Sequence, residues 1–169
     1  SVENPFSTSE AYLLCDIVEE NENTDNSFKL ITTGAIEPFE VLWGIKTTSY
    51  LKSKYENPII KRKSLEKLLP KRFIQQDCSK IAISGMRHFE AFFDYEGTYL
   101  SSKSTIIAKD FKNNKEGYYL VGLLNTKLIS FIIKESYSSL GIDGGINFSK
   151  QMVDDLPIPS ITVTNDIAT

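Results

Sequence analysis

A long apolar helix most constrains how this chain can fold. Residues 118–135 are predicted to be helical, with one apolar stripe at positions 121, 124, 128, 131 and 132. Further apolar residues widen the stripe at Leu120, Leu123, Ile129 and Ile133. So wide an apolar surface needs burial on more than one side. Polar residues interrupt the run, and it is shorter than the ~20 apolar residues of a membrane span, so we expect a buried core helix.

Two further segments follow the helix. A loop rich in serine and glycine covers Ser138 to Asn147 and contains Gly144 and Gly145. Its backbone amides are suited to holding a phosphate, whereas the alternative is that the glycines only permit a tight passage to the next segment. The local sequence favours the second interpretation. The stretch Leu156 to Pro159 is expected to close the domain like a strap.

The pattern of elements predicts an α+β fold, in which a mixed, twisted sheet is built largely from Lys80 to Asp110 and the long helix packs on it. Lys80–Met86 and Ser102–Asp110 read as strands. Between them, the residues Asp94 to Gly97 predict a hairpin turn. Upstream, Ser64 is expected to cap a short helix over Leu65–Leu69 that Pro70 ends.

The 169 residues suit one globular domain. We expect residues 1–26 to be an acidic linker or N-terminal extension, 27–160 the main domain and 161–169 a C-terminal tail. Two cysteines and no signal peptide favour a reducing, cytoplasmic setting without a membrane partner. Because the chain begins with Ser1 and not with methionine, we expect it to be an excised piece of a longer protein.

Charge is distributed unevenly along the chain. The overall net charge is −3, but residues 41–115 hold 15 basic and 7 acidic residues. The densest basic patch has one acid, Glu66, among Lys61, Arg62, Lys63, Lys67, Lys71 and Arg72. Such a segment indicates a polyanionic partner, while the alternative is that the lysines only solvate a surface. Both interpretations stay open from charge alone.

Three catalytic arrangements find little support. The sequence has no glycine-rich nucleotide-binding motif. A nucleophilic pair of Cys78 and His88 lacks a third partner. A divalent-metal nuclease through Asp94, Asp110 and Lys112 would need those side chains within a few ångströms of one another. We therefore expect neither a catalytic residue nor a bound metal in this chain.

Three stretches carry a family resemblance. They are Tyr119–Phe131, then Gly144–Phe148, then Leu156–Pro159, and the upstream order from about Phe28 fits as well. Together they resemble the C-terminal target-recognition domain of TaqI-like and fused type II adenine-specific DNA methyltransferases. Specificity subunits of type I restriction systems contain a related sequence pattern.

The resemblance implies that this chain recognises a sequence in double-stranded DNA and is not catalytic by itself. Its parent would be an N6-adenine DNA methyltransferase of a restriction-modification or phage-defence system, with or without a fused endonuclease. The catalytic lobe of that parent would be the second partner, and S-adenosylmethionine would be the parent's cofactor, with none in this fragment. The other lobe would flip the adenine and methylate it.

Charge and loop position, not the resemblance, supply the candidate DNA contacts. The residues expected to bind phosphates are Lys46, Lys61, Arg62, Lys63, Lys71 and Arg72. The candidates for base or loop contacts are Arg87, His88, Lys103, Ser139, Gly144, Gly145 and Asn147.

A protein-interaction lobe of the same kind of complex is the main alternative. The two interpretations predict different positions for the basic residues in the folded protein. DNA binding predicts that the basic residues between Lys46 and Lys112 converge on one concave face, whereas a protein-interaction lobe allows them to scatter.

Overall fold

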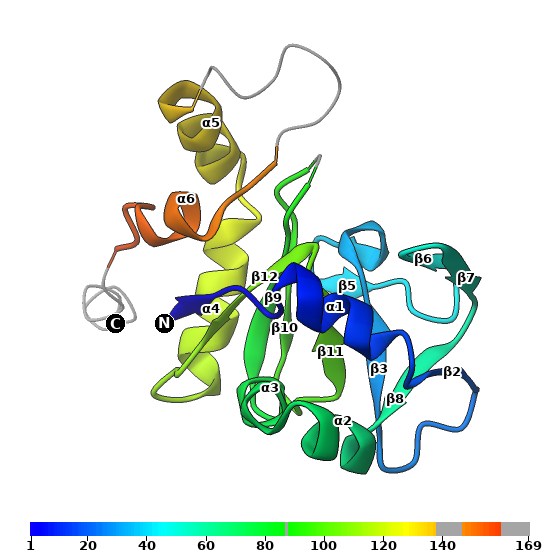
Figure 1. Ribbon diagram of the computed structural model, residues 1–169. Helices are drawn as coiled ribbons and strands as arrows, with labels where there is room; N and C mark the ends of the chain where they lie inside the picture. Colours follow the sequence, from blue (N-terminus) through cyan, green and yellow to red (C-terminus); the bar gives the residue numbers. More distant parts are fainter. Residues whose placement is uncertain (87, 138–146, 160–169) are drawn as a thin grey trace.

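The computed structural model describes residues 1–86, 88–137 and 147–159 and has an α+β fold, as the sequence predicts (Figure 1). The described strands form two four-stranded sheets and two short ribbons. Helices from the first half of the chain cover one sheet, and helices from the last third cover the other. Within the described residues, no helix has the length and apolar character needed to cross a bilayer.

Sheet A is antiparallel and has the strand order β1-β12-β9-β10. Its strands are β1 (Val2–Glu3), β9 (Lys80–Ser84), β10 (Ala91–Asp94) and β12 (Thr105–Lys109). The predicted region thus supplies most of this sheet, and the mixed strand directions that the sequence predicts occur in sheet B, to which the region contributes β11 (Tyr99–Ser101). Alternate residues of β9 and β10 point to opposite faces, with Ile81, Ile83 and Phe93 in the helix-covered core and Ala82 and Phe92 toward the other sheet.

Sheet B is the mixed sheet, with the strand order β11-β3-β8-β2. Its strands are β2 (Val18–Glu20), β3 (Ser27–Ile31), β8 (Pro58–Lys61) and β11 (Tyr99–Ser101). β11 runs parallel to β3, and the other neighbours are antiparallel. The hairpin predicted at Asp94–Gly97 is therefore wrong, because this turn carries the chain from β10 in sheet A to β11 in sheet B.

Small elements fill the space beside the two sheets. They are η1 (Thr33–Ala35), the ribbon of β4 (Ile36–Glu37) and β5 (Glu40–Val41), and the ribbon of β6 (Thr48–Tyr50) and β7 (Ser53–Tyr55). A third apolar cluster joins the sheets through Ile31, Ala35, Ile36, Ala82 and Phe92. The two sheets therefore form one packed unit.

Sheet B is covered by α1 (Thr8–Leu14), α2 (Arg62–Leu68) and α3 (Pro70–Gln76). Ser7 and Glu10 form a capping box at the start of α1. The N-cap of α2 is Lys61 and not the predicted Ser64, so that helix starts earlier than expected. It ends before Pro70, as predicted, and this proline then occupies the first turn of α3, where its missing N–H costs nothing.

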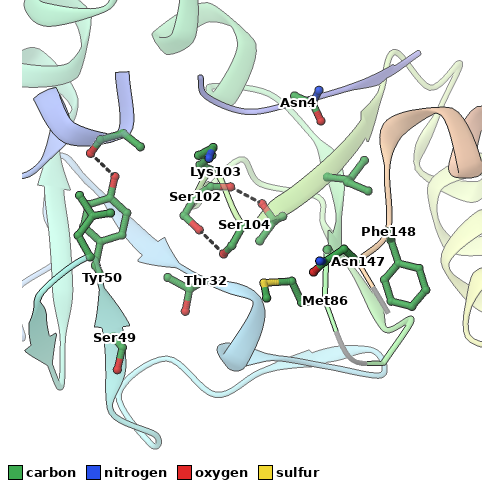
Figure 2. Close-up of a pocket in the computed structure, with 15 residues that line it drawn as sticks. Asn4, Thr32, Ser49, Tyr50, Met86, Ser102, Lys103, Ser104, Asn147 and Phe148 are labelled. Carbon is green, nitrogen blue, oxygen red and sulfur yellow. Dashed lines mark hydrogen bonds between the residues drawn. The ribbon is translucent and has the colours of Figure 1, made fainter. Parts of the chain in front are cut away.

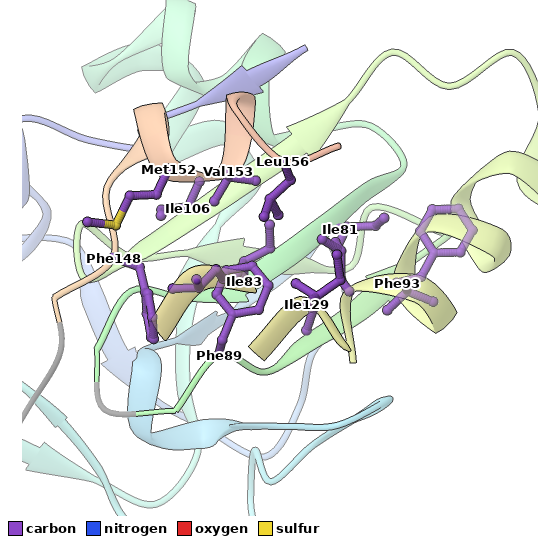
Figure 3. Close-up of a cluster of buried hydrophobic side chains, with 14 residues drawn as sticks. Ile81, Ile83, Phe89, Phe93, Ile106, Ile129, Phe148, Met152, Val153 and Leu156 are labelled. Carbon is purple, nitrogen blue, oxygen red and sulfur yellow. The ribbon is translucent and has the colours of Figure 1, made fainter. Parts of the chain in front are cut away.

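Sheet A is covered by α4 (Asn114–Leu124), α5 (Lys127–Ser136) and α6 (Lys150–Asp154). Figure 3 shows Met152, Val153 and Leu156 packed over Ile83 and Ile106 of the sheet. Leu156, the first residue of the expected strap, is buried there, and Pro157 to Pro159 are exposed.

The single helix predicted over residues 118–135 is wrong, because the chain breaks at Asn125 and Thr126. The Asn125 amide donates to the Ala91 carbonyl (2.8 Å) and accepts from the Ala91 N–H (2.9 Å), so it pairs with the edge of β10. The Thr126 hydroxyl accepts from Ile129 N–H and caps α5. The break changes which residues are buried: Ile129 and Ile133 enter the core, whereas Leu128 and Phe131 are each 60% exposed.

Residues 1–26, expected to be a linker or extension, contribute β1, α1 and β2. The amino group of Ser1 donates to the Lys109 carbonyl (2.8 Å), and Leu14 is fully buried. Glu19 and Glu20 of the acidic run lie in β2, and residues 21–26 form a largely exposed loop. The expected tail at 161–169 lies outside the described residues.

One buried ion pair connects these layers. Lys80 Nζ donates to Asp94 Oδ2 (2.7 Å) and to the Gln76 carbonyl at the end of α3 (2.8 Å). The Asp94 carboxylate also accepts from the N–H groups of Thr98 (2.9 Å) and Tyr99 (3.0 Å). The two side chains are 0% and 2% exposed. This pair holds the turn between the two sheets.

Replacing Lys80 with methionine tests the importance of this pair. The variant leaves the Asp94 carboxylate buried without its cation, so we expect it to lose about 3–5 kcal/mol of unfolding free energy. Urea denaturation measures the loss. The matched control is Lys115→Met at an exposed position, which is expected to stay within about 0.5 kcal/mol of the original chain. A loss below about 1 kcal/mol in Lys80→Met would contradict the assignment.

Candidate nucleic-acid interface

The basic patch predicted from the sequence lies on α2 and α3, where its lysines and arginines differ in their surroundings. Lys63, Lys67 and Lys71 are exposed. Lys61 is exposed as well and forms an ion pair with Glu19 at 3.2 Å. The arginines, in contrast, are partly buried and contact the rest of the protein.

Arg62 fastens the start of α2 to the turn between the sheets. Its guanidinium forms an ion pair with Asp77 and donates to the Gly97 carbonyl at 2.9 Å. It also lies over the ring of Phe28, with 4.0 Å between the guanidinium carbon and the ring centroid. This combination of contacts is typical of a structural arginine.

Arg72 joins α3 to α1. Its guanidinium donates to both carboxylate oxygens of Glu10, at 2.9 and 2.8 Å, and to the Gln75 side chain at 3.1 Å. These hydrogen bonds lower the pKa of Glu10 from its ordinary value of 4.5 to about 2, against the opposing effect of burial. Both arginines expected to bind phosphates thus hold parts of the fold together.

Other predicted residues meet at a groove on a different part of the molecule (Figure 2). The groove has a volume of about 400 Å³ and is lined by Lys103 and Asn147, two of the predicted candidates. The rest of its polar lining is mostly hydroxyl and amide groups, from Asn4, Thr32, Ser49, Tyr50, Ser102, Ser104 and Thr105. Lys103 is the one charged side chain among these lining residues.

The loop between β11 and β12 forms one wall, because it connects sheet B to sheet A at this point. The Thr33 hydroxyl donates to the Ser104 carbonyl and accepts from the Gly85 N–H. The hydroxyls of Ser102 and Ser104 lie 2.9 Å apart, within hydrogen-bonding distance. A β-carbon on Gly85 would lie 2.3 Å from the Ser104 carbonyl oxygen, so only glycine fits here.

The segment after β9 forms the facing wall. Met86 pairs with Asn147 in an antiparallel bridge, and Phe148 N–H donates to the Gly85 carbonyl at 2.9 Å. Asn147 is thereby fixed beside Met86, and Figure 2 shows these two side chains next to each other. Residues far apart in the sequence thus meet around one opening.

A second hollow of about 420 Å³ shares Met86 with the groove. It is lined by two more predicted residues, Lys46 and His88, and by the carboxylates of Glu37 and Glu90. Burial raises the pKa of Glu90, and the neighbouring Glu37 adds to that rise. Lys46, His88, Lys103 and Asn147 are therefore brought together around Met86.

The basic residues between Lys46 and Lys112 do not all converge on one concave face. Lys80 is buried, Lys109 pairs with Glu3 at 3.3 Å, and the lysines of α2 and α3 lie on the other sheet-covering layer. This scatter is the outcome that favours the protein-interaction alternative. Arg87, Ser139, Gly144 and Gly145 lie outside the described residues.

The two catalytic alternatives lack the required geometry. The Asp94 carboxylate already accepts hydrogen bonds from Lys80 and from two backbone N–H groups. Strand β9 lies between β10, which ends at Asp94, and β12, which precedes Asp110, so the two acids are roughly 10 Å apart across the sheet. Cys78 and His88 lie at opposite ends of β9, roughly 15 Å apart at the usual rise per residue. Burial also raises the pKa of the Cys78 thiol, which disfavours the reactive thiolate.

Sequence reasoning missed most of the groove lining. Thr32, Ser102 and Ser104 are polar residues of short loops, and Ser49 lies in the short strand β6. The sequence predicts that Ser102 to Ser104 belong to a strand, whereas these residues form the loop before β12 (Thr105–Lys109). Their common location follows only from the packing of the two sheets.

No model of a known protein family matches this sequence, and the search of curated proteins found no match either. The function proposed below therefore depends on the geometry of the site and on the resemblance described above.

A substitution at Glu10 tests the structural role of Arg72. Glu10 has a lowered pKa in the folded state, so it contributes stability above about pH 4.5 that is lost as the pH falls toward about 2. We expect Glu10→Gln to lose about 1–3 kcal/mol of unfolding free energy at pH 7.

Chemical denaturation between pH 2 and pH 7 measures this effect. The difference between the original chain and Glu10→Gln is expected to shrink as the pH approaches 2. The control is Glu66→Gln at an exposed position of α2. A difference that does not depend on pH would show that the Glu10 charge is not its cause.

Proposed function

We propose that this chain is the duplex-DNA recognition domain of an adenine-specific DNA methyltransferase or restriction-modification enzyme. One observation carries the proposal. Four residues that charge and loop position suggested as DNA contacts, Lys46, His88, Lys103 and Asn147, line two adjoining hollows. The resemblance supports the proposal from the sequence side.

The groove chemistry suits a duplex. Lysines neutralise phosphates, and hydroxyl and amide groups donate to phosphate and sugar oxygens or to base edges. Lys46 and Lys103 are exposed, and neither has a carboxylate within ion-pair distance among the described residues. Both can therefore reach a phosphate without breaking an ion pair of the described residues, which Arg62 and Arg72 cannot. Lys46 shares its hollow with the carboxylates of Glu37 and Glu90, and its charge acts on Glu90.

In this proposal the chain binds and orients the DNA, and the parent enzyme carries out the chemistry. The catalytic lobe would bind S-adenosylmethionine and flip the target adenine. A recognition lobe would hold the duplex on both sides of that base. The position of the groove beside the loop that joins the two sheets gives it rigid walls, which suits the positioning of a duplex.

A protein-interaction lobe is the second candidate. The scatter of the basic residues favours it, and so does the face of α5, where Leu128 and Phe131 are each 60% exposed. An exposed apolar helix face is typical of a contact with another protein surface. Under this reading, neutralising the groove lysines leaves any binding to duplex DNA unchanged.

Two double variants test the DNA proposal and locate its interface. The first, Lys46→Ala with Lys103→Ala, removes the charges at the hollows. We expect weaker binding to a duplex, and a plot of log affinity against log salt that is shallower by about 2, since each phosphate contact contributes about 0.9. Fluorescence anisotropy across a salt series measures both quantities.

The second variant, Lys63→Ala with Lys71→Ala, removes the same number of charges from α2 and α3. We expect its slope to match that of the original chain. A reduced slope in this variant alone would move the interface to α2 and α3. If the original chain shows no salt-dependent affinity for duplex DNA, the proposed function is wrong.

A further inference from the structure

The tip of the β6–β7 hairpin has an unusual backbone. Among the described residues, positive φ angles outside glycine occur at Asn26, Phe39, Leu51 and Asp110. Asn and Asp adopt this conformation readily, because their short polar side chains form local hydrogen bonds. Leu51 has a φ of 50° at the first position of the two-residue hairpin loop, where glycine is the favoured residue. A leucine is therefore strained at this position.

Packing does not compensate for this cost. The Leu51 side chain is 46% exposed, so about half of its apolar surface remains in water. Leu51 is therefore unfavourable both for its backbone conformation and for its exposure. Backbone strain of this kind is concentrated at active sites and ligand-binding sites, where it is part of the function.

The hairpin presents its tip rigidly. The neighbouring Tyr50 is 4% exposed and packs in the core of sheet B. Its hydroxyl donates to the Ala11 carbonyl of α1 at 2.7 Å. Figure 1 shows β6 and β7 as a pair at the edge of the molecule, outside both four-stranded sheets. The tip is thus accessible while its base is held by the fold.

The charges around the tip indicate the class of ligand. Lys52, the second residue of the loop, is exposed, and no carboxylate lies within ion-pair distance of it among the described residues. Leu51 also lines the groove that contains Lys103. Phe39, by comparison, lies in the β4–β5 turn between Glu37 and Glu40 and is 61% exposed. The tip at Leu51 therefore carries a positive charge suited to a polyanion, whereas the turn at Phe39 is flanked by two carboxylates.

We propose that the β6–β7 hairpin enters the major groove of DNA and that Leu51 contacts the C5-methyl group of a thymine. This inference rests on the proposed function. It adds that the hairpin is the element that recognises the DNA sequence. A two-stranded ribbon fits the major groove, which is about 12 Å wide, and apolar side chains read thymine there. Lys52 then contacts the adjacent phosphate backbone.

The variant Leu51→Gly tests the inference with little risk to the fold. Glycine adopts the same backbone conformation without strain, so the variant is expected to unfold at a urea concentration no lower than that of the original chain. The original chain and the variant are each used to enrich duplexes from a random pool. We expect the variant to lose the preference for thymine at one position of the enriched sequence and to keep the preferences elsewhere.

A chemical substitution in the DNA gives an independent readout. Replacing that thymine with deoxyuridine removes only the methyl group. We expect it to lower the affinity of the original chain by about fourfold, the equivalent of one buried methyl group. The affinity of Leu51→Gly is expected not to change, because its contact is already absent.

Two controls separate this contact from general effects. Phe39→Gly removes another exposed apolar residue with a positive φ angle, in a turn flanked by two carboxylates. We expect this variant to enrich the same sequence as the original chain. Lys52→Ala is expected to weaken binding to all duplexes and to reduce the salt slope by about 1 without changing the preference.

The possible failures are distinguishable. If the original chain enriches a sequence and Leu51→Gly enriches the same one, the inference is wrong and the proposed function stands. If the preference changes but deoxyuridine has no effect, Leu51 does not read a thymine methyl group and the inference is overturned in that form. If the original chain enriches nothing, both the proposed function and the inference are overturned.

Discussion

The buried pair of Lys80 and Asp94 is the interaction on which the arrangement of the two sheets depends. All of its groups have partners: the ammonium contacts the carboxylate and carbonyls at the end of α3, and the carboxylate receives two N–H groups of the following turn. A buried charge without such partners would be strongly unfavourable. The pair therefore favours the one chain path in which β10 ends in sheet A and β11 begins in sheet B.

That path also creates the candidate site. After β11, the chain returns to sheet A through Ser102 to Ser104, and this return forms one wall of the groove. Thr33 ties the wall to the start of η1, and Gly85 allows the two backbones to approach closely. The same crossings that join the sheets thus place hydroxyl groups, Lys103 and Asn147 around one opening.

The arginines illustrate why charge along the sequence is a weak guide to a binding surface. Arg62 and Arg72 belong to the densest basic patch, yet each pairs with an acid that is distant in sequence, Asp77 and Glu10. Planar guanidinium groups suit such bidentate and stacked contacts better than lysines do. The lysines around the hollows come from separate loops, so no local run of charge marked them.

The sequence by itself determined the α+β class, the core strands β9 and β12 and the end of α2 at Pro70. These features follow from local apolar patterns and from the missing N–H of proline, which act over a few residues. The tertiary structure decided the rest. The Asn125 side chain pairs with β10 and divides the predicted helix, Asp94 replaces a hairpin with a crossing between sheets, and the groove combines residues from seven separate stretches of the chain. Each of these depends on a partner far away in the chain, and a local pattern carries no information about that partner.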